Sequence, residues 1–197
     1  SSSRDFDGVV HFIFQPAEEH GRGALAMLAD GALDRFGVDE IYGLHNMPGQ
    51  PAGTFATRAG PVMAAEDNFE IVIHGQGVHA ARPHMGIDPI LVGSAAVMAL
   101  QSIVARRLDP VEPGVVSVTE FITDGTRNVI PTTVRIRGDV RSFRPEISAA
   151  IEAEMRRIAE ATAAAHGARA TVAYTREFIP TVNAPGPTEA ALRAATA

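Results

Sequence analysis

The first third of the chain alternates short apolar runs with one helical pattern. Residues 8–15 (GVVHFIFQ) are almost continuously apolar and predict a buried strand that ends at Pro16. A short helix is predicted over residues 24–33, and two further short strands over residues 40–44 and 53–57. Apolar strands alternating with a helix are typical of an α/β layer in which the sheet is covered.

From Glu66 onward the elements follow a different order. Alternation of apolar and polar residues predicts four half-buried strands, around residues 69–74 and over 115–123, 133–143 and 169–178. Two helices are predicted between them, over residues 88–108 and 145–166. The order β-α-β-β-α-β predicts an antiparallel four-stranded sheet with both helices on one face, the split βαβ or ferredoxin-like arrangement.

Links rich in Pro and Gly flank this second pattern on both sides. We therefore expect an inserted domain. The predicted fold class combines α/β and α+β: a partial α/β domain over 1–64, a complete ferredoxin-like domain over 65–178, and a return into the α/β domain over 179–197.

Composition and charge narrow the class of protein. The 197 residues are 46% hydrophobic and 20% charged, which is ordinary for a globular domain. The net charge is −6 and the basic residues do not cluster, so nucleic-acid binding is disfavoured. All 17 basic residues are Arg, and the lack of Lys excludes Schiff-base chemistry and Walker-type phosphate loops. The lack of Cys excludes thiolate ligands and fits a reducing, cytoplasmic location, and no apolar run reaches the roughly 20 residues of a membrane span.

The sharpest chemical signal is the adjacent pair Glu18 and Glu19, directly after the first predicted strand. Open α/β sheets bind ligands at this end of a strand. Neighbouring side chains of an extended segment point in opposite directions, so one carboxylate can bind a metal while the other acts as a base. His45 follows a later predicted strand, and with Glu19 it makes half of a metal site with oxygen and nitrogen donors. A solvated loop is the commoner setting for two adjacent glutamates, and no third ligand lies nearby in the sequence.

The second domain contributes three further polar candidates. His79 follows a Gly-rich turn (GQGVHA), Asn128 lies between two predicted strands (GTRNVIP), and Arg141 lies near the end of a strand (VRSF). Each is weak by itself, because turns favour Gly and Asn and arginines at sheet edges are common. Three other histidines are expected to be structural: His11, His74 and His166.

Taken together, the segments FQPAEE, GLHNMPG, GQGVHAARPHMGIDPI, NVIP and GDVRSF resemble the hippurate hydrolase and N-acyl-amino-acid amidohydrolase family. These enzymes are dinuclear metallopeptidases related to aminoacylases and carboxypeptidase G. The resemblance implies part of an α/β metallopeptidase catalytic domain with an inserted ferredoxin-like lid or dimerisation domain. It also implies hydrolysis of the amide bond of N-acyl amino acids (hippurate-like substrates) or small peptides, with two divalent metal ions (Zn, Mn, Ni or Co).

The resemblance gives each candidate residue of the first domain a role. Glu18 corresponds to the general base that activates a water, and Glu19 and His45 correspond to metal ligands. The family's upstream metal-binding segment, of the type H-x-C-G-H-D, is absent from this chain, as is its downstream His ligand. We therefore expect a fragment of a longer enzyme, inactive by itself, that binds no metal ion tightly. The alternative is a stand-alone, non-catalytic module for dimerisation or for binding a small acid.

The lid residues also acquire roles from the resemblance. His79 matches a histidine that reaches the partner subunit's active site and stabilises the oxyanion, whereas Asn128 and Arg141 match positions that bind the substrate's amide oxygen and carboxylate. Small residues at 93–96 would permit close approach of a second helix, and an unpaired sheet edge is a template for a second chain. We therefore expect a homodimer through residues 66–178.

Overall fold

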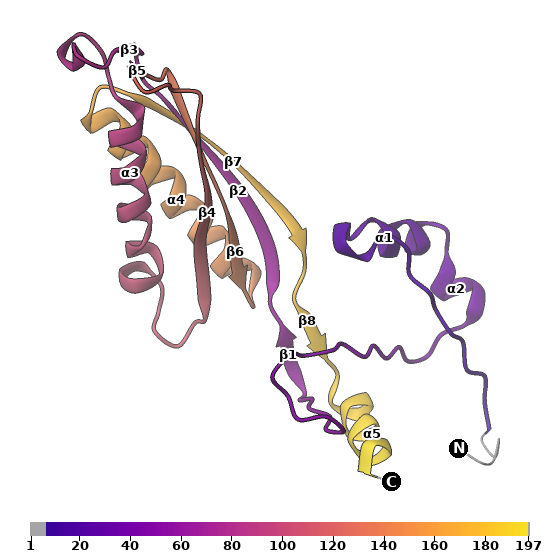
Figure 1. Cartoon of the computed structure of the whole chain (residues 1–197). Helices are drawn as coiled ribbons and strands as arrows, with labels where there is room; N and C mark the ends of the chain where they lie inside the picture. Colours follow the sequence, from indigo (N-terminus) through magenta and orange to yellow (C-terminus); the bar gives the residue numbers. More distant parts are fainter. Residues whose placement is uncertain (1–6, 197) are drawn as a thin grey trace. The chain divides into compact units, whose positions relative to one another are not determined.

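The computed structural model describes residues 7–196, except for the side chain of His20. The chain divides into two compact units, one that ends at Ala56 and one that begins at Thr57 (Figure 1).

The second unit is built on a four-stranded antiparallel sheet in the order β4-β6-β2-β7. Its strands are β2 (Ala65–His74), β4 (Gly114–Thr123), β6 (Thr133–Ser142) and β7 (Arg169–Phe178). Helices α3 (Pro89–Leu100) and α4 (Pro145–Ala165) lie side by side on one face of this sheet (Figure 1). The four long strands and helix α4 lie where the sequence pattern predicts them, and α3 begins where it was predicted to begin.

The core of this unit lies between the sheet and the two helices. Alternate residues of β2 and β6 point into it, and they are almost all apolar because a strand presents every second side chain to the same face. The largest fully buried side chains are Ile71, Ile73, Leu100, Ile103, Ile136, Ile151 and Met155. The opposite face of the sheet carries charged pairs, among them Glu70 with Arg135 and Arg137. Such exposed pairs contribute little to stability, about 0–1 kcal/mol each.

Local signals set the ends of the helices. The carboxylate of Asp88 accepts a hydrogen bond from the backbone N–H of Ile90 (2.8 Å), and Pro89 occupies the first turn of α3. Helix α4 ends at Ala165, His166 is its C-cap, and Gly167 then adopts a left-handed conformation with φ 72°. The helix predicted over 88–108 is divided, because α3 ends at Leu100 and a separate π-helical turn, η3 (Ile103–Arg107), follows.

The dimer argument from sequence assumed that the small residues of α3 face outward. Two of them, Gly93 and Ala96, do not. A Cβ on Gly93 would lie 3.1 Å from the ring of Phe121, and Ala96 is fully buried. Gly93 therefore packs against the chain's own sheet, and Ala96 lies in the interior of the unit. The exposed face of α3 carries larger apolar residues instead, Leu91 and Met98 among them.

Four short strands, a 3-10 turn and a last helix complete this unit. Strand β1 (Gly60–Met63) pairs with β8 (Thr181–Asn183), and helix α5 (Pro185–Thr196) follows β8. Strand β3 (Val78–His79) pairs with β5 (Val129–Ile130), and the 3-10 turn η2 (Pro83–Met85) follows β3. The four short strands and η2 escaped prediction because two to four residues are too few to show a periodicity.

The first unit differs from its prediction more strongly. Its described elements are η1 (Glu18–His20), α1 (Arg22–Ala29) and α2 (Ala32–Phe36). The strands predicted over 8–15, 40–44 and 53–57 are wrong: none of these segments forms a strand. A strand needs a hydrogen-bonded neighbour, and without one the apolar side chains remain exposed, by 82% for Phe12 and 84% for Leu44. His11 accordingly lies outside any strand.

Among the described residues, no helix is both long enough and apolar enough to cross a membrane.

Candidate functional site

Glu18 and Glu19 lie in a tight turn rather than in the extended segment expected from the sequence. They begin the 3-10 helix η1, which is flanked by left-handed backbone at Ala17 (φ 48°) and Gly21 (φ 63°). A positive φ is unusual for alanine and marks a constrained backbone. Successive residues of a 3-10 helix still differ in direction by about 120°. Both carboxylates are exposed, so the turn presents two separate acidic groups to solvent.

Gly23 explains how this turn closes. It is buried at the start of α1, and a Cβ at this position would lie 1.5 Å from the carbonyl oxygen of Pro16. The carbonyl therefore occupies the space that a side chain would need. This contact folds the segment after Pro16 back onto α1 and fixes the position of the glutamates within the turn.

His45 has the protonation pattern of a metal ligand. Its Nδ1 lies 2.8 Å from the carbonyl oxygen of Asn46. A carbonyl oxygen only accepts, so Nδ1 carries the hydrogen and Nε2 keeps its lone pair in the neutral ring. Metal-binding histidines usually hold their second nitrogen in this way.

The donor chemistry of Glu19 and His45 fits Zn²⁺ or a similar divalent ion, which binds carboxylate oxygen and imidazole nitrogen. The number of ligands does not suffice. Among the side chains that the structure describes, no group of three or more His, Asp or Glu residues could hold a metal ion. The two residues therefore form part of a ligand set at most.

The second unit brings His79 and Asn128 together. His79 lies in β3 and Asn128 just before β5, and the backbone N–H of Ala80 donates to the carbonyl oxygen of Asn128 (2.9 Å). Gly77 permits this approach, since a Cβ there would lie 2.9 Å from the carbonyl oxygen of Ile130. We use the name β3–β5 tip for β3, β5 and the turn Thr126–Val129, which leads into β5.

The imidazole of His79 is oriented by the backbone. Its Nδ1 accepts a hydrogen bond from the N–H of Ala81 (3.1 Å). The hydrogen of the neutral ring is therefore on Nε2, which is available as a donor. The side chain is exposed, so this donor can meet a group from outside the unit.

Arg141 lies in the four-stranded sheet, near the end of β6 that is remote from the β3–β5 tip. Strand β6 begins near the β3–β5 tip at Thr133, and eight residues at about 3.3 Å each place Arg141 roughly 26 Å further along. The structure thus groups His79 with Asn128 and separates Arg141 from both.

Two carboxylates hold the guanidinium of Arg141. Its Nη2 lies 2.7 Å from Glu66, and its Nε lies 2.9 Å from Asp139. Burial opposes the positive charge, but the hydrogen bond and charge of Asp139 and the charge of Glu66 outweigh it and raise the pKa of Arg141. Nε and Nη2 make these contacts, so Nη1 remains for a further acceptor.

Sequence reasoning missed the hydrogen bonds of a buried carboxylate, Asp67, and the ion-pair partners of Arg141. Asp67 is 2% exposed and its Oδ2 accepts hydrogen bonds from Ser148 (2.6 Å) and Tyr174 (2.7 Å). The signal was present in the pattern, because Asp67 occupies an inward position between Ala65 and Phe69. Of the two partners of Arg141, Glu66 could be found only from the register, which pairs it with Arg141, whereas Asp139 is two residues away on the same strand.

Comparison with known proteins now adds to this geometry. Residues 2–197 match the family described as Peptidase family M20/M25/M40. The chain belongs to the M20 family. Its relatives include an N-acetylcysteine deacetylase of Bacillus subtilis (strain 168), 42% identical over 182 residues, which cover 92% of this chain and 47% of the relative. An N-acyl-L-amino acid amidohydrolase of Geobacillus stearothermophilus is 39% identical over 180 residues, with 91% and 48% covered.

A solved M20 structure has the same fold. The crystal structure of a dinuclear metal-binding peptidase of the M20 family from Bacillus subtilis matches with a TM-score of 0.72 and 37% identity. The match covers 93% of this chain and 45% of that one. The chain thus spans about half the length of the M20 relatives that it matches.

Proposed function

We propose that the full-length protein is a metal-dependent amidohydrolase that cleaves the amide bond of N-acyl amino acids, hippurate-like compounds included, or of small peptides. The observation that carries the proposal is the M20 match over residues 2–197. The names of the relatives support the reaction class, since they include a deacetylase and an N-acyl-amino-acid amidohydrolase. The name of the structural neighbour, a dinuclear metal-binding peptidase, supports divalent metal ions.

The residues of the first unit then have distinct tasks. Glu19 and His45 would hold metal, and the free Nε2 of His45 suits this role. When bound, two divalent ions would supply the Lewis acidity that polarises the amide carbonyl and acidifies a water. Glu18 takes the proton of that water and returns it to the leaving amine. We infer that the remaining ligands come from parts of the protein outside this chain, which by itself is inactive.

The residues of the second unit bind and stabilise the substrate. His79 donates from Nε2 to the oxyanion, Asn128 donates to the amide oxygen, and Arg141 donates to the carboxylate from Nη1. One lid cannot place all three around one small substrate, because roughly 26 Å separates Arg141 from the β3–β5 tip. We infer that each active site uses Arg141 of its own subunit and the tip of a second subunit.

We assign residues 65–178 to an inserted lid and dimerisation domain of the ferredoxin-like type. The strand order β4-β6-β2-β7 supports this assignment. Its first and last strands are neighbours, with Glu66 opposite Phe178, so the chain enters and leaves the domain side by side. The flanking segments 1–64 and 179–197 would then belong to the catalytic domain.

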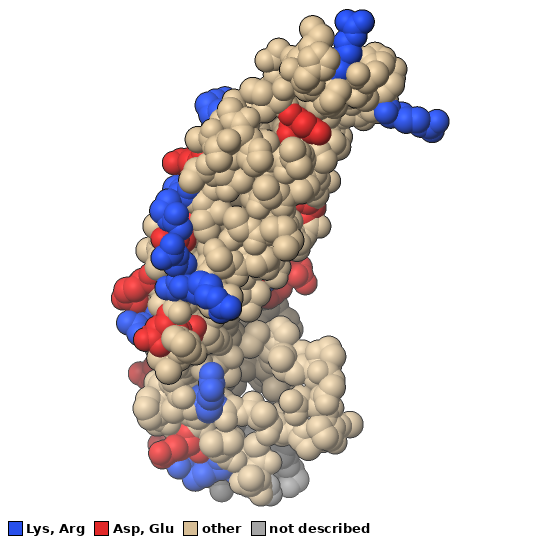
Figure 2. Space-filling model, turned by 90° about the vertical axis from the view of Figure 1, so that its left-hand side faces the viewer, with Lys and Arg blue, Asp and Glu red and all other residues tan. Residues whose placement is uncertain are grey.

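We propose that a second copy of this chain covers the exposed face of α3. The sequence of α3 has no charged residue, and Leu91 and Met98 are 60% and 73% exposed. Figure 2 shows a broad area without charged side chains on this side of the molecule. Beside it, β4 is the outer strand of the sheet and has a free edge.

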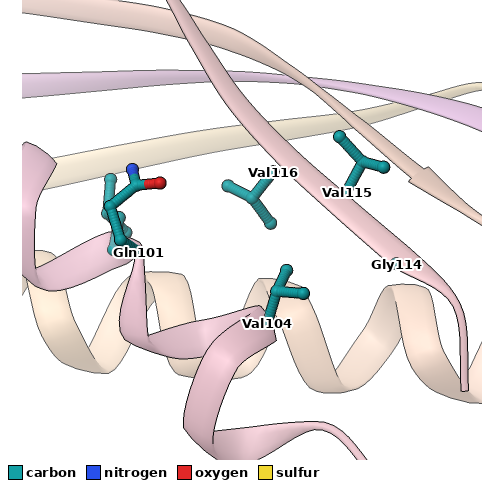
Figure 3. Close-up of a pocket in the computed structure, with 6 residues that line it drawn as sticks. Gln101, Val104, Gly114, Val115 and Val116 are labelled. Carbon is teal, nitrogen blue, oxygen red and sulfur yellow. The ribbon is translucent and has the colours of Figure 1, made fainter. Parts of the chain in front are cut away.

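A hollow between η3 and β4 continues this surface. Its volume is about 240 Å³, and it is lined by Leu100, Gln101, Val104, Gly114, Val115 and Val116. Val104 and Val116 point into it from opposite sides (Figure 3). An apolar side chain of a second copy would fill this space.

Light scattering tests the dimer. This chain should have twice the mass of a monomer, and Met98→Glu should reduce it to one chain because a charge would be buried in the interface. Glu146→Ala, at an exposed position of α4, is the control and should stay dimeric. A monomer of the unaltered chain at high concentration would contradict the proposal.

Activity is tested on the full-length protein with N-acetyl and N-benzoyl amino acids. Glu18→Gln should keep bound metal and lower kcat by about 10²–10⁴-fold, the usual size of general-base catalysis. Mixed dimers of Glu18→Gln and His79→Ala subunits should regain part of the activity that each variant lacks. No recovery despite proven subunit exchange would place His79 outside the neighbouring site, and a full-length protein without any metal-dependent hydrolysis would favour the non-catalytic module.

A further inference from the structure

A side-chain hydrogen bond orients Asn128 within the β3–β5 tip. The turn Thr126–Val129 is closed by the N–H of Val129, which donates to the carbonyl oxygen of Thr126 (3.1 Å). Asn128 is the third residue of this turn. The hydroxyl of Thr126 donates to Oδ1 of Asn128 (3.2 Å). The residue that opens the turn therefore contacts the amide that the turn presents.

In the structure, this contact leaves the nitrogen end of the amide free. Asn has one acceptor oxygen and one nitrogen with two hydrogens, at opposite ends of a planar group. With Oδ1 directed to Thr126, Nδ2 points the other way and remains available as a donor. The N–H of Ala81 has the same effect on His79, because it occupies Nδ1 and leaves the Nε2 hydrogen. Two separate contacts thus give the tip the same polarity, with donors outward.

We propose that Thr126 is a positioning residue that acts through Asn128, holding its amide so that Nδ2 faces the substrate. The proposal rests on the proposed function, in which Asn128 binds the amide oxygen of the substrate. An amide oxygen only accepts, so a reversed Asn128 would set two acceptors against each other. The β-branched side chain of Thr126 suits the task because few χ1 angles are open to it.

The first test uses this chain and does not depend on activity. Thr126→Val removes the hydroxyl and keeps the shape, whereas Thr126→Ser keeps the hydroxyl. We expect the side-chain Cγ and Nδ2 resonances of Asn128 to shift in the Val variant and to stay near their positions in the Ser variant. The backbone amide of Ala80 should remain protected from exchange in both, which shows that β3 and β5 are still paired. An Asn128 side chain that does not respond to Thr126→Val overturns the proposal.

The second test uses the full-length enzyme and a double-mutant cycle. Thr126→Val should lower kcat/KM about 2- to 10-fold, the size of one neutral hydrogen bond. It should have no further effect when Asn128 is already Ala. Thr175→Val on strand β7, an exposed threonine outside the tip and outside the proposed dimer surface, is the matched control and should leave kcat/KM unchanged.

The outcomes separate the two proposals. If Asn128→Ala leaves kcat/KM unchanged, the role proposed for Asn128 is wrong. If Asn128→Ala is damaging but Thr126→Val has the same effect with and without Asn128, Thr126 does not act through the amide and the further inference is wrong.

Discussion

The buried carboxylate of Asp67 gives the sharpest prediction about stability. Asp67 on β2 is 2% exposed, and Ser148, in the first turns of α4, is 3% exposed. The Ser148 hydroxyl and the Tyr174 hydroxyl donate to the same oxygen, Oδ2. Ser148→Ala removes one of these two donors and leaves the packing almost unaltered.

The expected cost follows from burial. A hydrogen bond to a charged acceptor contributes about 1.5–3 kcal/mol, and removing its donor leaves the acceptor partly unsatisfied. Alanine is a better helix former than serine by about 0.5 kcal/mol, which offsets part of the loss. Ser148→Ala should therefore lower the free energy of unfolding by about 1–2.5 kcal/mol. Tyr174→Phe should cost less, because Tyr174 is only half-buried and water can reach the vacated place.

Urea unfolding followed by circular dichroism measures the effect as a lower midpoint at an unchanged slope. Thr196→Ala is the control: its hydroxyl donates to the carbonyl oxygen of Leu192 at an exposed site in α5, and its loss should cost almost nothing. The two changes at Asp67 should be non-additive, since they share one acceptor. A loss below about 0.5 kcal/mol for Ser148→Ala, no larger than that of the control, would refute the reasoning that Asp67 depends on these hydroxyls.

Three further predictions concern other parts of the chain. Gly23→Ala should disrupt the turn that holds Glu18 and Glu19, because its Cβ would meet the Pro16 carbonyl oxygen, and hydrogen exchange of the α1 backbone amides should become faster. Gly186→Ala in α5 is the control: a Cβ there meets nothing within 4 Å, so the change should be neutral or should stabilise the fold by up to about 1 kcal/mol. Burial and the hydrogen bond to Asp67 raise the pKa of Tyr174, so the folded state keeps the phenol proton at a pH where the unfolded chain loses it. The free energy of unfolding should therefore fall as pH rises above about 10, by at most about 1.4 kcal/mol per pH unit. Tyr174→Phe should remove this pH dependence in urea titrations. Calorimetric titration of this chain with Zn²⁺ or Mn²⁺ should give weak binding that His45→Ala abolishes, whereas a tight two-metal site would contradict the incomplete ligand set.

The sequence by itself determined most of the second unit. Its four long strands have ten residues each, long enough for alternation to identify them and to assign their inward faces. Asp88 and Pro89 identified the start of α3 because capping is a local interaction. The chemical identity of the candidates was also readable, since Glu18, Glu19 and His45 stand in short motifs.

The same reasoning failed in the first unit. The run 8–15 has the composition of a buried strand, yet it forms none and exposes Phe14 by 88%. Strand propensity expresses fit to neighbouring strands and to a covering layer more than a preference of the backbone. A pattern within eight residues cannot supply those neighbours.

Only the tertiary structure decided how the candidate groups are combined. His79 and Asn128 are 49 positions apart in sequence, and the β3–β5 pairing makes them neighbours. Asn128 and Arg141 are 13 positions apart, and β6 carries them to opposite ends of the sheet. Distance along a chain says little about distance in space, because an extended strand moves away by about 3.3 Å per residue while a pairing returns remote segments to contact. Periodicity and caps are local and can be read from the sequence, whereas pairing between remote segments is set by the packing of the whole domain.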